Sequence, residues 1–461
     1  MSHFTKSAKN ATPLIPLTKD QLAKWQKKQS QRVQAWLSST GFKAGPGETC
    51  LLSDNNGKLN QVLVGVSKAA DLWDCGNLSK SLPAGNYCFD QSKAADIEKW
   101  ALGWALGAYS FGRYKNDQKQ PKKARLLLPK TCDSRSLENT VEAFYLARDL
   151  INTPAGDMAP AQLASAARAL AKKHKATCKV IVGKDLLAKN YPAIHAVGRA
   201  VETKDQAPRL IDFSWGKKAA PKVTLVGKGV CFDTGGLDLK SAGGMKLMKK
   251  DMGGAANVLG LAHMIMAAKL PIRLRVLIPA VENSVSGNAL RPLDVVPSRN
   301  GKTIEIGNTD AEGRVILADA LSEAAREKPE LIVDFATLTG AARVALGAEV
   351  PALFSNDDKF AANVIKAGMA IQDPLWQLPL WPGYRKAVTG KTADLTNAPE
   401  GGFGGAITAA LFLQEFVEPA TKWAHIDLMA WNQGSKPGRP EGGEAMGIRA
   451  FFNTLKEIYT S

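Results

Sequence analysis

Long apolar segments are missing from this 461-residue sequence. No apolar run reaches the roughly 18 residues that a membrane-spanning helix needs, and the N-terminal stretch MSHFTKSAKNATPLIPLTKDQLAKWQKKQ contains no signal-peptide core. We therefore expect a protein that works in the cytoplasm and has no membrane partner. With 45% hydrophobic and 22% charged residues, the composition is that of a globular chain and not of a disordered one.

Paired cysteines and closely spaced histidines are also lacking. The six cysteines are Cys50, Cys75, Cys88, Cys132, Cys178 and Cys231. None forms a CxxC pair, so we predict free buried thiols and neither a disulfide framework nor a thiolate zinc site. No histidine pair has HExxH spacing, and the histidines that could suggest a dyad or a zinc site are predicted to be structural: His174, His195, His263 and His425. Neither GxxxxGK[ST] nor GxGxxG is present, which disfavours nucleotide binding.

Positive charge is in excess, with a formal net charge of +17. About half of this excess falls within the first 150 residues, in clusters such as KKQSQR and QKQPKKAR. Two interpretations remain open. A polyanion could bind there, or the lysines could form an ordinary solvated surface, which is the interpretation we favour because most of them stand singly among polar residues.

The chain changes character near residue 130. Before it, apolar runs such as QVLVGVS and KARLLLP alternate with turn residues and with a helical pattern at DIEKWALGWALGAYSF, which predicts a smaller, basic α/β domain over residues 1–136. The stretch SLENTVEAFYLARDLINTPAGDMAP then shows helical spacing and ends at a Pro/Gly break. We expect a linker helix over 137–160.

The remainder, residues 161–461, alternates apolar runs with helical patterns. The runs are CKVIVGK, RLIDFSW, KVTLVGK, IRLRVLIPAVE, ELIVDFATLTG and KWAHIDL, and helices are predicted at 254–268, 314–327 and 406–417. Strands that are apolar on both faces and separated by helices belong to sheets covered on both sides. We therefore expect an α/β catalytic domain with a mostly parallel sheet and helices on both faces.

Two carboxylates and a guanidinium alternate in the stretch IGNTDAEGRVILADAL, at Asp310, Glu312 and Arg314. If the backbone is extended there, the three side chains project the same way at the carboxyl edge of a strand, just before a helix that begins at Val315. The alternative is that the acidic residues only favour a helix N-terminus. A role in favouring the helix N-terminus would give no reason for Arg314 at the third alternating position.

A second stretch, VGKGVCFDTGGLDLKSAGGMKLMKKDMGGAANV, carries further candidates. Lys228 follows a buried strand, Asp233 comes five residues later, and Lys240 and Asp251 precede a helix that opens at Gly253. If the aspartates and the glutamate of both stretches converge, four carboxylates repel one another unless cations lie among them. Two divalent ions would supply the matching charge.

Four segments resemble the leucine aminopeptidase (cytosol aminopeptidase) family of two-metal exopeptidases: VGKGVCFDTGG, NTDAEGR, ARDLINTPAGDMAP and GGFGGAITAALFLQEFV. The similarity runs from about residue 137 to the C-terminus, whereas the first 130 residues carry no motif and are compatible only in length and α/β character. The resemblance implies a metallo-aminopeptidase that hydrolyses the N-terminal residue from peptides with a free N-terminus. It also implies a homo-hexamer.

Roles for the candidate ligands follow from this resemblance. It implies that Asp233 and Glu312 bridge two metal ions, that Asp310 completes the more exchangeable site, and that Lys228 with Asp251 completes the tighter one. Oxygen ligands without histidine suit several ions, so we expect Mn²⁺ or Zn²⁺, with Mg²⁺ and Co²⁺ as alternatives. As a ligand Lys228 must be neutral, far from its reference pKa of about 10.4.

Two further residues take catalytic roles by the same resemblance. Lys240 would stay protonated and stabilise the oxyanion. Arg314 would hold a bicarbonate ion that relays a proton, and the alternative is a plain ion pair with its acidic neighbours.

The side-chain pocket is implied to consist of Met248, Thr337, Gly340, Met429 and Asn432. In HIDLMAWN, Met429 stands where the family usually has alanine, so a preference for leucine does not carry over. Met429 could also belong to the core.

One function of another class remains, a nucleic-acid-binding regulator built on the same scaffold. The basic N-terminal third motivates it. A protein that only binds would not need all seven metal and catalytic positions, and all seven are present, so the aminopeptidase is the prediction.

Overall fold

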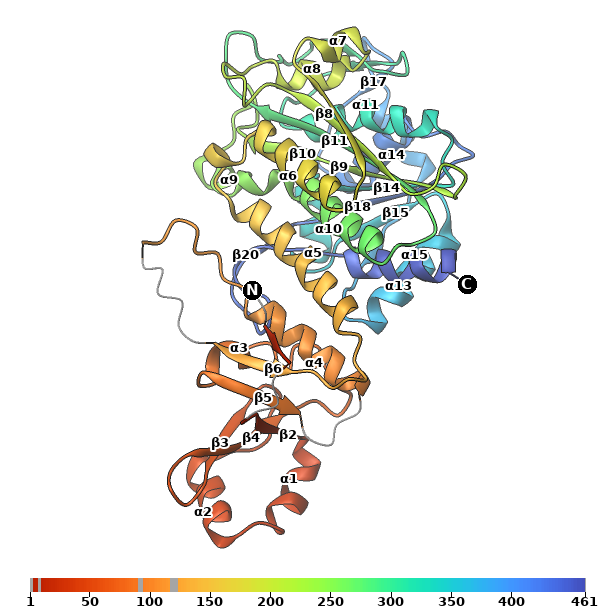
Figure 1. Ribbon diagram of the computed structural model, residues 1–461. Helices are drawn as coiled ribbons and strands as arrows, with labels where there is room; N and C mark the ends of the chain where they lie inside the picture. The colour runs from red at the N-terminus through yellow and green to blue at the C-terminus, as the bar shows by residue number, and fades with distance from the viewer. Residues whose placement is uncertain (1–2, 7–9, 90–93, 117–122, 461) are drawn as a thin grey trace. The chain divides into compact units, whose positions relative to one another are not determined.

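The structure is a computed structural model, and it describes residues 3–6, 10–89, 94–116 and 123–460. By its internal contacts the chain divides into two compact units: Met1–Tyr145 with Gly434–Glu441, and Leu146–Gln433 with Gly442–Ser461 (Figure 1). The boundary falls inside helix α5, Ser134–Asn152. The domain limits at 136 and 160 stay predictions, and the basic cluster QKQPKKAR lies partly outside the described residues.

The first unit is built around a six-stranded sheet of order β1-β6-β5-β2-β4-β3, in which only the β3–β4 pair is antiparallel. Its strands are β1 Phe4–Thr5, β2 Thr12–Leu17, β3 Thr49–Ser53, β4 Leu59–Gly65, β5 Gly85–Phe89 and β6 Ala124–Leu127. Its helices are α1 Lys19–Gln26, α2 Gln31–Thr40, α3 Leu78–Ser81 and α4 Ala94–Gly107. The predicted apolar runs are β4 and β6 and the predicted helix is α4, so the α/β character is confirmed.

The second unit contains a nine-stranded sheet of order β16-β15-β18-β14-β9-β11-β8-β7, with β10 also paired to β11. Its strands are β7 Thr177–Val182, β8 Arg209–Trp215, β9 Lys222–Gly227, β10 Gly229–Asp233, β11 Arg273–Asn283, β14 Leu331–Ala336, β15 Ala352–Ser355, β16 Trp376–Gln377 and β18 Lys422–Asp427. The central strands β18, β14, β9 and β11 are parallel, whereas the β7–β8, β8–β11 and β15–β18 pairs are antiparallel. All six predicted runs are strands of this mostly parallel sheet.

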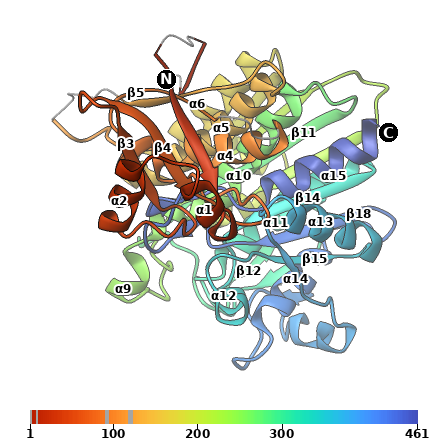
Figure 2. The same ribbon diagram turned by 90° about the horizontal axis from the view of Figure 1, so that it is seen from below.

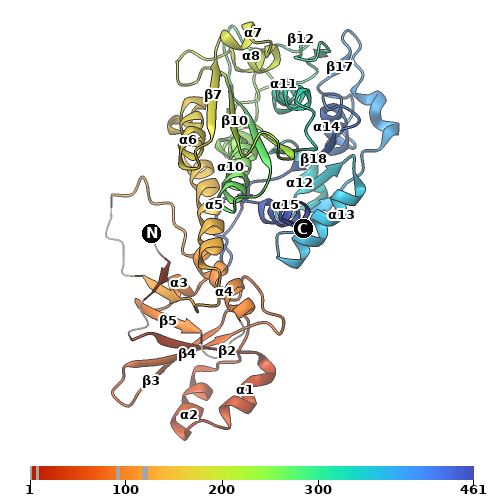
Figure 3. The same ribbon diagram turned by 45° about the vertical axis from the view of Figure 1, so that its right-hand side comes forward.

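Helices cover both faces of this sheet (Figures 1 and 3). One face carries α6 Pro160–Lys173, α10 Gly253–Ala267, α13 Asp358–Ala370 and α15 Ile448–Thr460, and the other carries α8 Pro192–Gly198, α11 Glu312–Arg326 and α14 Gly405–Gln414. Helix α10 is apolar all round because it packs between the sheet and α15. Figure 2 shows α13 and α15 side by side. The predicted helices at 254–268, 314–327 and 406–417 correspond to α10, α11 and α14.

Shorter elements complete the second unit. The helical ones are η1 Ala155–Asp157, α7 Asp185–Ala188, α9 Ala242–Met245, η2 Met248–Met252, α12 Gly340–Leu346 and η3 Pro382–Val388. The strands β12 Val295–Pro297, β13 Thr303–Glu305 and β17 Leu395–Thr396 form a small sheet, and β19 Trp431–Asn432 pairs with β20 Gly442–Gly443. Within the described part of the chain, no helix combines the length and apolar character that crossing a bilayer would require.

The N-terminus of α10 lies directly against the end of β14. A Cβ atom at Gly254 would lie 2.0 Å from the backbone oxygen of Phe335, so only glycine permits this approach. The close packing brings Asp251, just before α10, to the carboxyl edge of the central strands, where α/β sheets place ligands.

The expectation of an extended segment at Asp310, Glu312 and Arg314 is wrong. Helix α11 begins at Glu312, so Glu312 and Arg314 lie in its first turn, and the preceding strand β13 belongs to the small sheet and not to the central one. The physical reason is a contact distant in sequence. The fully buried side chain of Asn397 accepts from the backbone N–H groups of residues 307 and 308 and donates to the carbonyl groups of residues 308 and 311, which closes a turn.

Candidate metal centre

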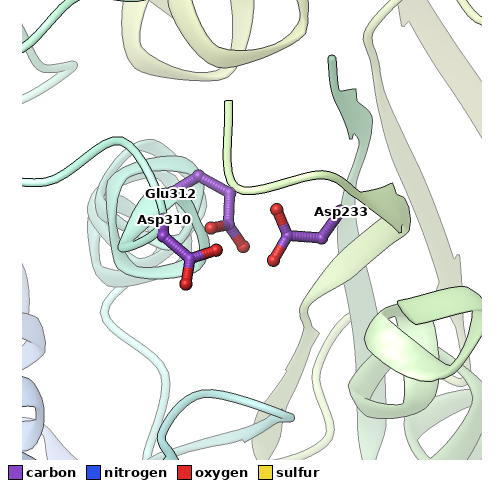
Figure 4. A group of neighbouring side chains, drawn as sticks. All are labelled: Asp233, Asp310 and Glu312. Atoms are coloured by element: carbon purple, nitrogen blue, oxygen red, sulfur yellow. The ribbon is translucent and has the colours of Figure 1, made fainter. Parts of the chain in front are cut away.

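Three carboxylates of the second unit converge on one point. Asp233 ends β10, Asp310 lies in the turn before α11, and Glu312 is the first residue of α11. One oxygen of each side chain lies within 4.8 Å of the others, and Figure 4 shows the three carboxylates pointing toward one another. Asp233 and Glu312 are buried, whereas the side chain of Asp310 is 33% exposed. The structure thus brings together three residues that the sequence predicts to be ligands.

Lys228 connects this cluster to a fourth carboxylate. Its Nζ lies 2.7 Å from Asp251 Oδ2 and 3.0 Å from Glu312 Oε1, and it donates to the carbonyl oxygen of Thr337 at 3.0 Å. Burial lowers the pKa of Lys228, but the surrounding carboxylates raise it by more, which favours the protonated amine in the absence of a metal ion. Gly313 leaves room for it, since a Cβ atom there would lie 2.5 Å from Lys228 Cε.

Lys240 is more exposed than Lys228 and contacts two other carboxylates of the cluster. Its Nζ lies 2.9 Å from Asp233 Oδ2 and is also ion-paired with Asp310. Burial lowers the pKa of Lys240, and the two carboxylates raise it by more. The other oxygen of Asp233 accepts from Asn283 Nδ2 and from the backbone N–H of Gly235, both at 2.9 Å, so the carboxylate is held in one orientation.

The electrostatics of the cluster fit bound cations. Four carboxylates face two ammonium groups, which leaves two negative charges without a partner. Burial and the charge of Asp233 raise the pKa of Asp310 to about 6 and the pKa of Glu312 well above its usual range. Among the described residues, Glu312 Oε2 is buried and receives no hydrogen bond. Hard divalent cations bind oxygen atoms whose lone pairs are free and point toward a common position.

Arg314 lies in the first turn of α11 but does not pair with the carboxylates. Its Nη1 donates to the carbonyl oxygen of Asn397 at 2.6 Å, and burial lowers its pKa to about 10 although Asp427 and Glu312 raise it. No carboxylate within the described residues lies at ion-pair distance from its guanidinium. Its buried Nε donates no hydrogen bond to any of these residues. The plain ion pair is therefore not what the structure shows, and the guanidinium retains capacity for an anion.

The five predicted pocket residues occupy different settings. The Thr337 hydroxyl donates to Asp251 Oδ1 at 2.8 Å, so it orients a candidate ligand. Asn432 is buried, and its Nδ2 donates to Glu444 Oε2 at 2.6 Å. Met248 opens η2 and is partly buried, while Gly340 opens the exposed helix α12 and Met429 is 5% exposed.

Two cations near these residues were not predicted from the sequence. Arg343 of α12 donates from Nη1 to the sulfur of Met429 at 3.2 Å. Lys250 of η2 is buried, and burial together with Lys228 and Arg343 lowers its pKa to about 8 against the opposing effect of neighbouring carboxylates. In the sequence both residues have the pattern of ordinary surface charges, and only the folded chain shows that Lys250 is buried and that Arg343 contacts Met429.

The histidines and cysteines form no catalytic set in the described residues. His425 is fully buried, with Nδ1 2.6 Å from Asp334 Oδ1, and its ring stacks between Phe354 and Trp423. His174 Nε2 and His263 Nδ1 are hydrogen-bonded at 2.9 Å. All six cysteines are free, four buried and two partly buried. The structural interpretation of these residues agrees with their contacts.

Fold and site together define an α/β domain with a cluster of carboxylates at the edge of its sheet. The family model "Cytosol aminopeptidase family, catalytic domain" matches residues 145–452, and "M17 aminopeptidase, N-terminal domain" matches residues 12–129. The chain therefore belongs to the cytosol aminopeptidase family and is a peptide-bond hydrolase. The second match extends the resemblance to the N-terminal region, where the sequence alone showed no motif.

Individual relatives agree with this assignment. A "Probable cytosol aminopeptidase" of Syntrophotalea carbinolica is 36% identical over 456 residues, which cover 91% of this chain and 90% of the relative. A crystal structure of a cytosol aminopeptidase from Coxiella burnetii is 50% identical, has a TM-score of 0.95 and matches over 99% of both chains. The bottromycin maturation enzyme BotP in complex with Mn is 32% identical, with a TM-score of 0.87 over 97% of this chain and 99% of that one. Nothing in these comparisons points to the nucleic-acid-binding alternative.

Proposed function

We propose that this aminopeptidase removes the N-terminal residue from peptides with the aid of two divalent metal ions held by the carboxylate cluster. The observation that carries the proposal is the convergence of four carboxylates, three of them buried, with a charge deficit of two and with an oxygen of Glu312 that no donor satisfies in the described chain. A structural ion-pair network would balance its charges. This one does not.

Each ligand takes its role from its place in the cluster. Asp233 and Glu312 lie between the two lysines and would contact both ions, Asp310 would complete the open site, and Asp251 with Lys228 would complete the buried one. Bound there, the ions supply an activated water and polarise the carbonyl group of the substrate. The surrounding carboxylates raise the pKa of Lys228, so its role as a ligand requires loss of its proton when metal binds.

The remaining groups act on the substrate. The Lys240 ammonium, 15% exposed at the open side, donates to the negative charge that develops on the carbonyl oxygen of the scissile bond. Arg314 holds a bicarbonate ion through guanidinium nitrogens that no protein carboxylate occupies among the described residues. The carboxylate of Asp251 attracts the free α-amino group, which restricts hydrolysis to the first residue of a chain.

Metal, location and assembly are further parts of the proposal. Oxygen donors suit Mn²⁺ and Zn²⁺, with Mg²⁺ and Co²⁺ as alternatives, and the Mn complex of BotP supports Mn²⁺. We propose work in the cytoplasm, which the names of the relatives support, and assembly into a homo-hexamer, which only the family resemblance supports.

The test is hydrolysis of aminoacyl amides after removal of metal and reconstitution with Mn²⁺, Zn²⁺, Mg²⁺ or Co²⁺. We expect activity to return with at least one ion, two ions bound per chain, and no cleavage of N-acetylated substrates. Full activity without metal would refute the two-metal centre. A salt-dependent shift of random duplex DNA without any peptide hydrolysis would favour the nucleic-acid-binding alternative.

A further inference from the structure

A cavity of about 450 Å³ lies in the second unit, between the start of helix α6 and the end of strand β11. Helix α6 packs against β10 and β11 in this region (Figure 1). The volume is that of an ordinary small-ligand site. The residues that line the cavity come from three segments: Ala155, Gly156, Ala159 and Gln162, then residues 203–206, and Glu282 of β11.

This cavity is separate from the metal centre. Side chains alternate between the two faces of a strand, so Glu282 projects to the opposite face of β11 from Asn283, which donates to Asp233. None of the lining residues is a predicted metal ligand.

Glu282 is the buried acid of the cavity, with 7% of its surface exposed. Gln206 Nε2 donates to its Oε2 at 2.9 Å, whereas its Oε1 accepts no hydrogen bond from any described residue. No cation of the described chain lies at ion-pair distance from it, and burial raises its pKa although the bond from Gln206 lowers it. A buried carboxylate without a cation and with an unused oxygen is unfavourable unless a ligand completes it.

A second acceptor in the cavity is also unused. Gln162 Oε1 is buried and accepts no hydrogen bond within the described residues. The orientation of this amide is set by its other end, because Nε2 donates to Asp205 Oδ2 at 3.0 Å. Lys204 and Asp205 are both exposed, so their charges offset each other in water and Glu282 leaves the cavity with a net negative charge.

The start of α6 does not supply the missing donors. The backbone N–H of Ala161 donates to the carbonyl oxygen of Asp205, and the N–H groups of Gln162 and Leu163 donate to that of Ala159. The cavity therefore presents unused acceptors and negative charge, which is complementary to a cation that carries several N–H donors.

The kind of cation follows from the number of acceptors. A calcium ion takes six or more oxygen ligands, and a search of the described residues for three metal-ligating groups that converge finds them at the metal centre and not in this cavity. A guanidinium group is planar, weakly hydrated and donates to several acceptors at once. We propose that this cavity binds the guanidinium group of a small organic cation, which pairs with Glu282 and donates to Gln162 Oε1. The inference is independent of the proposed function.

The experiment compares methylguanidinium with N-methylurea, which has nearly the same shape and no charge, by NMR titration of the metal-loaded, full-length protein. The wild type should bind methylguanidinium at least about tenfold more tightly, the ratio that about 1.4 kcal/mol gives. Glu282→Gln keeps the shape and an acceptor for Gln206, and should remove this preference. Glu202→Gln removes the same charge from an exposed residue outside the cavity, so it is the matched control and should change nothing.

A second variant keeps the test valid if Glu282→Gln does not fold. Gly156→Trp adds bulk at the lining of the cavity, where a Cβ atom meets nothing within 4 Å, and should weaken methylguanidinium binding at least about tenfold with Glu282 intact. Absence of binding to the wild type, or equal affinity for N-methylurea, would overturn the proposal. Sedimentation tests an arginine of a second copy as the occupant. Dissociation of an oligomer in Glu282→Gln, without methylguanidinium binding to the wild type, would replace the small cation with that arginine.

Discussion

Gly313→Ala should disable the metal centre without unfolding the protein. The added Cβ would lie 2.5 Å from Lys228 Cε and 2.7 Å from its Nζ, about 1 Å closer than ordinary carbon contacts allow. The backbone of α11 is rigid there, so the flexible end of Lys228 must move by that amount. Its contacts with Asp251 at 2.7 Å and Glu312 at 3.0 Å then fail together.

The expected magnitudes differ for folding and for metal binding. Alanine is favoured over glycine inside a helix by about 1 kcal/mol, which offsets part of the about 3 to 5 kcal/mol lost with the buried ion pairs, so the free energy of unfolding should fall by about 2 to 4 kcal/mol. Metal affinity and kcat/KM should each fall by about 10² or more, since even residues that only support a metal ligand cost 10- to 100-fold.

Metal titration, amide hydrolysis and urea unfolding of the same preparation test this prediction. Gly243→Ala in α9 is the matched control, because a Cβ atom there meets nothing within 4 Å. Unchanged metal affinity and activity in Gly313→Ala would show that Lys228 has no part in the centre. A loss of stability that accounts for the whole loss of activity would show that Gly313 is needed only for folding.

Other substitutions test other parts of the structure. Asp233→Asn should release metal and abolish hydrolysis, and two ions per chain with normal turnover would contradict its bridging role. Lys240→Ala should lower kcat by about 10² or more at constant metal content, measured by steady-state kinetics with metal analysis, and an unchanged kcat would remove it from the mechanism. Met429→Ala should raise kcat/KM for leucyl and phenylalanyl relative to alanyl amides by at least several fold. If Met429 is core, the melting temperature falls and all substrates change together. Asp334→Asn should lower the free energy of unfolding by about 3 kcal/mol or more at pH 6, because it leaves a buried charge on His425 without its partner. Burial lowers the pKa of His425, but Asp334 raises it by more, so the stabilisation is complete below the unfolded pKa of about 6.5 and is lost as the pH rises through the folded pKa. A difference between wild type and Asp334→Asn that does not shrink in urea unfolding at higher pH would contradict this assignment.

The sequence predicts the central elements well because apolar periodicity is a local property. The runs KVTLVGK and ELIVDFATLTG are β9 and β14, and the pattern at 254–268 is α10, since continuous burial selects these residues whatever lies beside them. The direction of a strand within the sheet is not a local property and cannot be predicted in the same way. Nothing within RLIDFSW shows that β8 runs antiparallel to β11, because the pairing depends on a connection that the strand itself does not encode.

The limits of prediction at the site have the same origin. Motif residues predict that Asp233, Asp310 and Glu312 meet, and the structure places their oxygens together. The turn that orients the last two is closed by Asn397, more than 80 residues away, so alternation in the sequence suggested a strand where the chain begins a helix.

Two charged residues near the predicted pocket are not identified by any local pattern. Arg343 stands between Ala342 and Val344 on a short exposed helix, and Lys250 stands in a run of basic residues before Asp251. Each has the sequence context of a solvated charge. Lys250 is buried in the fold and burial lowers its pKa to about 8, whereas Arg343 stays exposed and contacts the sulfur of Met429. A motif of spaced carboxylates can therefore predict a candidate cation-binding cluster, whereas the surroundings of the nearby charges follow only from the folded chain.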